Sequence, residues 1–259
     1  MKDKIEHCKN DIVSWAESYF IHATTTTGKS LITFSDKQKE VLISFVNDKR
    51  SITRAARRTG KTSLCIVYSL WQTTLFANKN VKFYTHSFIS VRNIMSRIMF
   101  AYKNLLDVLK PTIIKETETE VWFDNGSSIH VCNISATPIS MSDCAIFDEL
   151  AYCHIADRII FDEEDHIKFT FANDGVAQVL DNIPKIVIIS TPYTIKDNIF
   201  SSIWNLTSSN DEDNIWKKHT LLWNESFSMH DEKWKNDIIS VMGLERWKNE
   251  RECEFSEND

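Results

Sequence analysis

The feature that most constrains the fold is the stretch RAARRTGKTSLCIVYSL, residues 54–70. It contains the tripeptide GKT at residues 60–62, which ends the phosphate-binding signature G-x-x-x-x-G-K-[ST]. The position five residues before Gly60, where the signature has its first glycine, holds Ala55, and the loop carries two arginines, Arg57 and Arg58. A small residue such as alanine still lets the loop turn. The stretch therefore predicts a strand, a phosphate-binding loop and a helix in an α/β protein.

The residues on both sides of this loop have the patterns that such a unit requires. Residues 49–55 (KRSITRA) predict a modest strand, and the apolar side chains of residues 62–76 recur every three or four positions, which predicts a helix. A second Gly-Lys-Ser, at residues 28–30, follows a run of threonines instead of a strand and precedes no long helix. We therefore interpret residues 22–30 as a loop and this GKS as a coincidence.

The remaining segments predict an α/β fold with a mainly parallel sheet. Apolar strands expected at residues 81–85, 143–147 and 185–189 alternate with helical segments. Near-continuous apolar strands are typical of a parallel sheet that helices cover on both faces. Residues 124–126 (DNG) predict the turn of a β-hairpin. We expect one domain over residues 1–259, made of a helical and loop extension (1–35), a nucleotide-binding core (36–208) and a C-terminal subregion (209–259).

Composition narrows the class of protein. The chain has 36 acidic and 30 basic side chains and a net charge of −6. Because nonspecific DNA affinity comes mainly from clustered Lys and Arg, this balance argues against a global DNA clamp and leaves room for a local basic face. No apolar run approaches the roughly 18 residues of a membrane span, so we expect no membrane association. The six cysteines are scattered without a C-x-x-C pair, which favours reduced thiols in an intracellular protein.

The phosphate-binding loop has a defined chemistry. Successive backbone N–H groups at the positive end of a helix can surround an anion. Lys61 would add a charge at the β- and γ-phosphates, and Thr62 would add a hydroxyl ligand for Mg²⁺. Gly60 lies where the backbone must approach the phosphates, so a side chain there would be in the way. These residues predict a site for a nucleotide with Mg²⁺.

Two carboxylates, Asp148 and Glu149, close the apolar strand of CAIFDELAY, residues 144–152. A strand that ends in Asp places the carboxylate at the edge of the sheet where ligands bind, and there Asp148 can hold Mg²⁺. Glu149 can orient and deprotonate an attacking water, which distinguishes a hydrolase from a passive nucleotide binder. An acidic pair is also favourable at a helix start. The pair lies ~80–90 residues after the GKT, with strands and helices between, and this order favours the catalytic interpretation.

Hydroxyl and arginine side chains complete the candidate site. Ser190 and Thr191 end the strand at 185–189, where they can hydrogen-bond a γ-phosphate or the attacking water, although Ser-Thr-Pro is also an ordinary strand-ending turn. Phosphoryl transfer depends on neutralising charge, and a well-placed arginine is worth about 10³–10⁵ in rate. Arg57 or Arg58 can supply this charge from within the loop, and we expect one of the two to remain at the surface.

In this order and spacing the motifs resemble the ATPase domain of the large terminase subunit of tailed bacteriophages. The resemblance rests on the loop ARRTGKT (56–62), the hairpin DNGSSIHV (124–131), DELAY (148–152), STP (190–192) and RWKNERECEF (246–255), and it covers roughly residues 33–255. It implies an additional-strand, catalytic-glutamate P-loop NTPase fold. Two departures are the absence of an Arg-Gly pair in residues 135–143 and the presence of Arg58 where the family usually has Gln.

The resemblance also implies site residues. Arg57 would be the catalytic arginine, Glu149 the catalytic carboxylate, Gln38 the glutamine that reads adenine, and Ser190-Thr191 the motif that couples hydrolysis to motion. The metal ligands would be Thr62 and Asp148. The residues expected to contact the nucleotide are Gln38, Ala56, Arg57, Arg58, Thr59, Gly60, Lys61, Thr62 and Ser63.

The implied activity is Mg²⁺-dependent ATP hydrolysis that packages double-stranded viral DNA into a prohead, in the cytoplasm of an infected bacterial host. The implied partners are the portal protein, the small terminase subunit and further copies of the chain in a ring, with a monomer possible in isolation. The nuclease domain of large terminases would begin where this chain ends, so no nuclease activity is expected from it.

Two other functions fit the motifs less well. A helicase-like ATPase normally needs a second RecA-like domain, for which 259 residues leave little room. A nucleotide-binding regulatory module without turnover would not need the complete set of Lys61, Thr62, Asp148 and Glu149.

Overall fold

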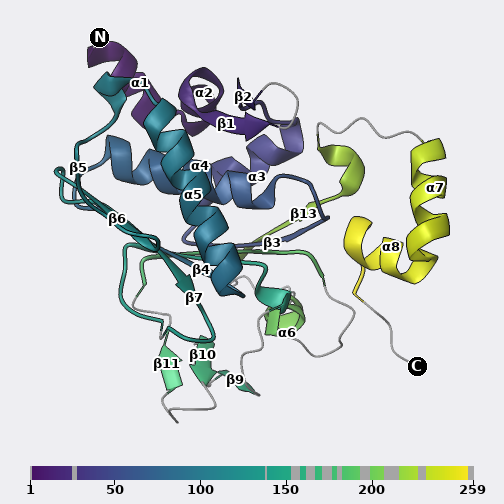
Figure 1. The fold of residues 1–259 in the computed structure, drawn as a ribbon. Coiled ribbons are helices and arrows are strands. Elements are labelled where there is room, and N and C mark those ends of the chain that lie inside the picture. Colours follow the sequence, from purple (N-terminus) through teal and green to yellow (C-terminus); the bar gives the residue numbers. More distant parts are fainter. Residues whose placement is uncertain are drawn as a thin grey trace.

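The computed structural model describes residues 2–24, 28–137, 139–152, 158–161, 167–170, 177–179, 183–192, 199–206, 216–226 and 232–255 (Figure 1). Its helices are α1 (Lys2–Asn10), α2 (Ile12–Tyr19), α3 (Asp36–Asn47), α4 (Lys61–Leu75), α5 (Phe88–Asn104), α6 (Ile199–Leu206), α7 (Glu232–Met242) and α8 (Leu244–Arg251), with short 3₁₀ turns η1 (Asp107–Leu109), η2 (Leu150–Tyr152) and η4 (Trp223–Glu225).

Three sheets contain the strands. The main sheet has the order β13-β3-β12-β8-β4-β7-β6-β5, and β1-β2 and β11-β10-β9 form two small antiparallel sheets. The strands are β1 (Ile21–Thr24), β2 (Gly28–Leu31), β3 (Arg50–Ala55), β4 (Asn80–Thr85), β5 (Ile113–Glu116), β6 (Glu120–Phe123), β7 (Ser128–Asn133), β8 (Cys144–Asp148), β9 (Arg158–Phe161), β10 (Ile167–Thr170), β11 (Ala177–Val179), β12 (Lys185–Ser190) and β13 (Trp216–Leu221).

The main sheet is parallel from β13 to β7, and β6 pairs antiparallel with both β7 and β5. Strand β12 lies between β3, which feeds the phosphate loop, and β8, which ends in the carboxylates, so that Ile188 pairs with Ile52 on one side and Phe147 on the other. The loop, the carboxylates and the Ser-Thr pair therefore all lie at the carboxyl edge of three neighbouring strands. The expected α/β P-loop fold with an additional strand and a mainly parallel sheet is confirmed.

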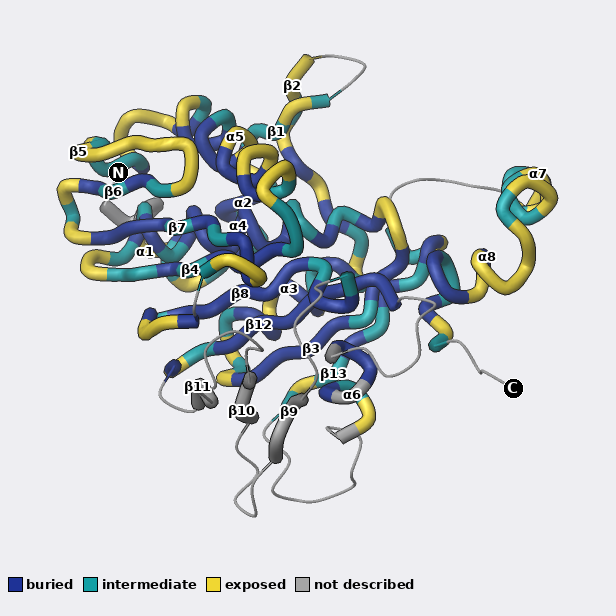
Figure 2. The backbone as a smooth tube through the Cα atoms, turned by 60° about the horizontal axis from the view of Figure 1, so that its bottom comes forward, coloured by how far each residue is buried: buried dark blue, intermediate teal, exposed yellow. Residues whose placement is uncertain are grey.

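Both faces of this sheet are covered, as the continuous apolar strands predicted. Along β12, Val187 and Ile189 belong to a core formed with α2–α5, whereas Ile186 and Ile188 belong to a smaller core formed with η2 and α6. Figure 1 shows α1–α5 gathered on one face and α6 on the other, and Figure 2 shows β3, β8 and β12 buried between these layers.

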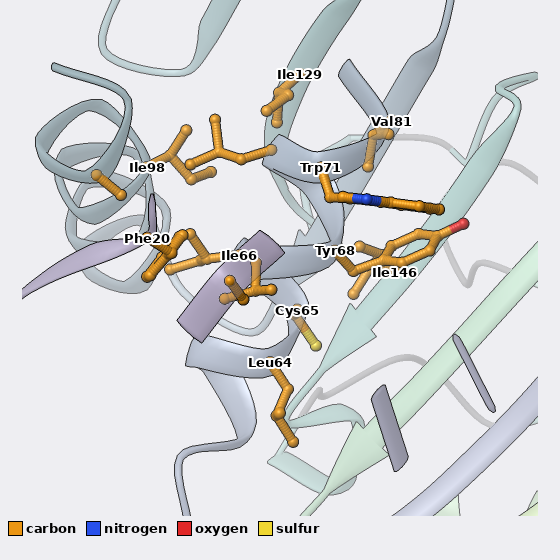
Figure 3. Packing of buried hydrophobic residues seen from close by; sticks show 14 of the residues in the cluster. Phe20, Leu64, Cys65, Ile66, Tyr68, Trp71, Val81, Ile98, Ile129 and Ile146 are labelled. Carbon is orange, nitrogen blue, oxygen red and sulfur yellow. The ribbon is translucent and has the colours of Figure 1, made fainter. Parts of the chain in front are cut away.

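Helix α4 is the centre of the larger core. Its buried apolar side chains run from Leu64 to Trp71, and Figure 3 shows them together with Ile98 of α5 and Ile146 of β8. The Trp71 indole also donates a hydrogen bond to the Cys8 carbonyl at 2.8 Å. This packing fixes the helix whose first turn begins with Lys61.

The interpretation of residues 22–30 as a loop is wrong. β1 and β2 pair as an antiparallel hairpin from Ile21–Leu31 to Thr24–Gly28, with residues 25–27 outside the described part of the chain. The His22 ring nitrogen lies 3.1 Å from the Ser30 hydroxyl across this pair. The two strands are only partly buried, β1 against α5 and β2 against α2, so their residues do not form an alternating apolar pattern. The Gly-Lys-Ser at 28–30 is thus part of a strand, and it does not precede a helix.

The C-terminal part of the chain contributes a strand to the main sheet and a separate cluster of tryptophans. β13 pairs in parallel with β3 at the edge of the sheet. Trp223, Trp234 and Trp247, from η4, α7 and α8, pack with ring centroids 5.3–5.8 Å apart. They hold α7 and α8 beside the end of β3 (Figure 1). No helix in the described part of the chain combines the length and the apolar character that a membrane crossing requires.

Candidate nucleotide site

The loop between β3 and α4 is held in shape by its own polar groups. Thr59 donates a hydrogen bond from its hydroxyl to the Ala56 carbonyl at 2.7 Å, which closes the turn. Arg58 and Gly60 have left-handed backbones, with φ of 68° and 79°. Gly60 is the residue that favours this conformation, and a Cβ there would also come within 3.2 Å of the Gln38 amide nitrogen. The backbone therefore explains why glycine stands directly before the lysine.

Lys61 joins the three strand ends. Its ammonium lies 2.8 Å from Glu149 Oε1 and donates to the Thr191 hydroxyl at 2.7 Å and the Ala56 carbonyl at 3.5 Å. The side chain is only 6% exposed. A buried cation requires a counter-charge, and here Glu149 supplies it.

Thr62 and Asp148 form the second contact between the loop and the carboxylate strand. The Thr62 hydroxyl donates to Asp148 Oδ2 at 2.9 Å. Burial, followed by the neighbouring charge of Glu149, raises the pKa of Asp148 to about 7, while Lys61 acts in the opposite direction. Asp148 Oδ1 is buried and has no hydrogen-bond partner within the described residues. An unpartnered carboxylate oxygen beside a hydroxyl is a hard oxygen donor set that fits Mg²⁺.

The described residues contain no group of three or more His, Cys, Asp or Glu that could hold a metal by itself. This is compatible with Mg²⁺, which is usually bound by one or two carboxylates together with substrate phosphates and water. Thr62 and Asp148 are the residues that would hold it.

Glu149 leaves the strand with a left-handed backbone, φ 57°. Its N–H donates to the Ile189 carbonyl at 2.9 Å, and its Oε2 accepts from the Thr191 N–H at 3.1 Å. Non-glycine residues rarely adopt this conformation, and such residues concentrate at functional sites. The turn directs the carboxylate to Lys61 and Thr191.

Ser190 and Thr191 connect the site to the segment after the carboxylates. The Ser190 hydroxyl accepts a hydrogen bond from the Ala151 N–H at 3.0 Å, so the end of β12 is tied to η2. Thr191 contacts both Lys61 and Glu149. The structure brings the expected coupling pair into the site, and its role remains a prediction.

The two loop arginines differ in their contacts. Arg57 forms an ion pair with Glu250 of α8 at 3.2 Å, and its N–H donates to the Glu250 carbonyl at 2.8 Å. Arg246 donates to the same carboxylate at 2.8 Å. Arg58 is exposed, with no hydrogen bond or ion pair within the described residues. Both arginines line the same pocket.

Gln38 lies beneath the loop. Its amide nitrogen donates to the Thr59 carbonyl at 2.9 Å, and its oxygen accepts from the Ser35 N–H at 2.8 Å as part of the capping box of α3. Gln38 does not line the pocket described below. Its expected role in adenine recognition remains a prediction.

A pocket of about 610 Å³ opens over the loop. Six of its fourteen lining residues are basic and two are acidic, in a chain of net charge −6, so the pocket suits a polyanion. The sequence did not identify half of this lining: Arg97 of α5 and, from α7 and α8, Ile238, Val241, Met242, Arg246, Glu250 and Arg251. Arg246, Glu250 and Arg251 lie in the segment 246–255 that carried part of the resemblance, but no role in the site was predicted for them.

No protein-family model matches the chain. Solved structures do share its fold at low sequence identity. The large terminase of bacteriophage HK97 matches with a TM-score of 0.70 and 13% identity, over 95% of this chain and 55% of that one. The ATPase domain of the large terminase of Thermus phage P74-26 matches with a TM-score of 0.61 and 14% identity, over 83% of this chain and 93% of that one.

The large terminase of the thermophilic bacteriophage D6E in complex with ATP-γ-S matches with a TM-score of 0.56 and 13% identity, over 86% of this chain and 53% of that one. The chain thus spans about half of the two longer terminases. The resemblance to large terminase ATPase domains inferred from the sequence is confirmed at the level of the fold.

Proposed function

We propose that this chain is a Mg²⁺-dependent ATPase that powers the packaging of double-stranded viral DNA. The observation that carries the proposal is the position of Lys61, which joins the phosphate loop to Glu149 and Thr191 at the carboxyl ends of neighbouring strands. A passive nucleotide site would need the lysine and would not need the carboxylate poised beside it.

Binding of ATP would exchange the partners of Lys61. The loop N–H groups and the start of α4 would hold the phosphates, and Lys61 would move its charge from Glu149 to the β- and γ-phosphates. Thr62 and Asp148 would hold Mg²⁺, which neutralises phosphate charge when bound. Gln38 would contact adenine. The exchange leaves Glu149 without its cation and able to accept a proton.

Hydrolysis would then proceed from these positions. Glu149 takes a proton from a water molecule, the water oxygen forms a bond to the γ-phosphorus, and the bond from that phosphorus to the β,γ-bridging oxygen breaks to release ADP. Arg57 neutralises charge on the transferring group after separating from Glu250. Ser190 and Thr191 contact the γ-phosphate or the water and transmit its loss through β12.

The assembly is proposed from the likeness in fold alone. The chain would act with copies of itself in a ring at the portal of a prohead, with the small terminase subunit, on double-stranded DNA. Its acidic balance fits a motor whose contact with DNA is local.

The activity is tested by steady-state ATPase assays on the whole chain and two variants. Lys61→Ala and Glu149→Gln are each expected to reduce turnover at least about 100-fold, and Glu149→Gln is expected to retain ATP binding. The matched control is Glu118→Gln, since that carboxylate is 75% exposed and pairs with Arg92 away from the pocket. Unchanged turnover in either site variant would contradict the proposal.

The motor role is tested by adding duplex DNA, single-stranded DNA or portal-bearing proheads to the same assay. We expect stimulation by duplex DNA with proheads, and packaged DNA protected from nuclease. Stimulation by single strands alone would instead favour a helicase-like ATPase.

A further inference from the structure

Arg97 of α5 reaches the nucleotide pocket from a helix that carries no phosphate-binding motif. Its guanidinium donates to the Ser63 hydroxyl at 2.7 Å, although the two residues are 34 positions apart. It is the residue through which α5 lines the pocket. The hydrogen bond holds a cation beside the first turn of α4.

Arg97 differs from the paired cations of the pocket. Within the described part of the chain no acidic oxygen lies within ion-pair distance of it, whereas Lys61, Arg57 and Arg246 are paired with glutamates. An unpaired arginine at the wall of a polyanion pocket is suited to pair with the ligand.

The guanidinium also has space around it. A second cavity of about 250 Å³ lies between β1, α4 and α5, and Arg97 and Ser63 line both this cavity and the nucleotide pocket. The side chain is exposed, so a small movement toward the pocket is not blocked by core packing.

We propose that Arg97 is a nucleotide-binding residue that contacts the α- or β-phosphate. The proposal rests on the proposed function of the pocket. The backbone N–H groups of a phosphate loop surround the α- and β-phosphates, while the lysine reaches the β- and γ-phosphates. Ser63 follows Thr62 in the first turn of α4, so a guanidinium fixed to its hydroxyl lies beside the helix start that would face the phosphates. Its fork of donors suits phosphate oxygens.

Calorimetric titration of the whole chain with Mg²⁺-ADP and with a non-hydrolysable Mg²⁺-ATP analogue tests this assignment. Arg97→Gln is expected to raise both dissociation constants by a similar factor, about 10- to 100-fold. The control is Arg92→Gln on the same helix, because Arg92 is 72% exposed and pairs with Glu118 outside the pocket. Equal thermal midpoints of the nucleotide-free variants would show that the helix is intact.

The other outcomes separate this assignment from the function it rests on. Binding by Arg97→Gln that equals that of the unmodified chain would overturn the assignment alone. Weaker binding of the ATP analogue with unchanged ADP binding would overturn it as well, because it would place the guanidinium at the γ-phosphate. If the unmodified chain binds neither nucleotide, the proposed function fails and the role of Arg97 fails with it.

Discussion

At the scale of single residues, the nucleotide-free site is held together by charges that a nucleotide would redistribute. Lys61 is buried with Glu149 as its counter-charge, and Arg57 is paired with Glu250. Because Lys61 is buried, leaving its charge unpaired would be costly, whereas the Arg57 side chain is 47% exposed and its ion pair contributes less. A phosphate that takes over either cation leaves a glutamate unpaired. Binding and rearrangement are therefore coupled through the same few side chains.

The two loop arginines can be separated by mutation. We expect Arg57→Ala to lower ATP turnover at least about 100-fold and Arg58→Ala less than about threefold, because Arg57 is the one that Glu250 holds at the pocket and one cation suffices to neutralise the transferring group. Steady-state kinetics at saturating ATP would measure both. Equal small effects would remove the role assigned to Arg57, and thermal midpoints would identify a variant that loses activity by unfolding.

The raised pKa of Asp148 can be tested through the thermal stability of the protein, without an assay of activity. Burial is the main reason that the pKa of this carboxyl is raised from its ordinary value of 3.8 to about 7. The folded state then binds the proton more tightly than the unfolded state, so this group lowers the free energy of unfolding as the pH rises from about 4 to about 7. Asp148→Asn removes this term, and in the nucleotide-free chain its Tm should exceed that of the unmodified protein by roughly 5 °C at pH 8 and by less at pH 5.

Thermal unfolding at pH 5, 6.5 and 8 without Mg²⁺ would check this expectation. A difference in Tm that stays constant or shrinks with rising pH would contradict it. Thr62→Val is a useful companion, because it removes the hydrogen bond to Asp148 and keeps the titrating carboxyl.

The site residues that the sequence could identify are those carried by local patterns. Lys61, Thr62, Asp148 and Glu149 follow strands or begin a helix, so their neighbours in the chain predicted where they lie. Arg97 gave no such signal, because a polar residue on an amphipathic helix has many solvent-exposed equivalents. The pair of Arg57 with Glu250 joins residues 193 positions apart, and only the folded chain shows it.

At the scale of elements, α3 is fixed to the phosphate loop at its start and to the first residue of β12 at its end. At its start Gln38 contacts the Thr59 carbonyl of the loop. At its end the Lys185 ammonium donates to the carbonyls of Phe45, Val46 and Asp48 at 2.6–2.9 Å. The last carbonyls of a helix have no partners within it, and a lysine is suited to satisfy them. Lys185 also begins β12, so helix and strand are joined.

Removing this cap should weaken the fold. We expect Lys185→Met to lower the free energy of unfolding by about 1–3 kcal/mol, since the alkyl chain remains and the carbonyls lose a charged donor. Chemical denaturation would measure it. Lys217→Met is the control, because Lys217 is exposed on the edge strand β13. A loss no larger than that of the control would show that water replaces the ammonium without cost.

The type of an element could be predicted where its apolar residues form a clear pattern. Which strands lie side by side in the sheet could not be predicted. The apolar runs of β8 and β12 and the periodicity of α4 and α5 predicted their types, since each depends on burial of local residues. The β1–β2 hairpin was not predicted, because its strands carry mostly polar side chains and show no alternation of apolar and polar residues. The position of β13 beside β3 depends on a pairing 166 residues away in the chain, between Arg54 and Thr220.

At the scale of the whole molecule, the C-terminal part is joined to the core through β13. Its strand pairs with β3 along six residues, and the Leu221 carbonyl accepts from the Ala56 N–H at the mouth of the loop, at 2.8 Å. Arg251 donates to the Arg57 carbonyl at 2.7 Å from α8. The phosphate loop is therefore supported from a segment outside the expected core of residues 36–208.

A chain shortened to residues 1–208 should lose cooperative thermal unfolding. It would expose the hydrogen-bonding edge of β3, whose Ser51 and Thr53 are fully buried in the whole chain. A chain of residues 1–226 keeps β13 and should unfold cooperatively at a lower Tm. Circular dichroism during heating would compare the three, and a Tm of the shortest chain within about 3 °C of the full one would contradict the expectation.

The tryptophan cluster has an optical consequence. Trp223 lies just after β13, whereas Trp234 and Trp247 belong to α7 and α8. The centroids of the three rings lie within 5.8 Å of one another. The same two helices line the pocket. Indole emission is sensitive to the contacts of the ring. A displacement of these helices when the pocket fills would therefore change the intrinsic fluorescence, so the chain carries its own optical reporter of events at the pocket.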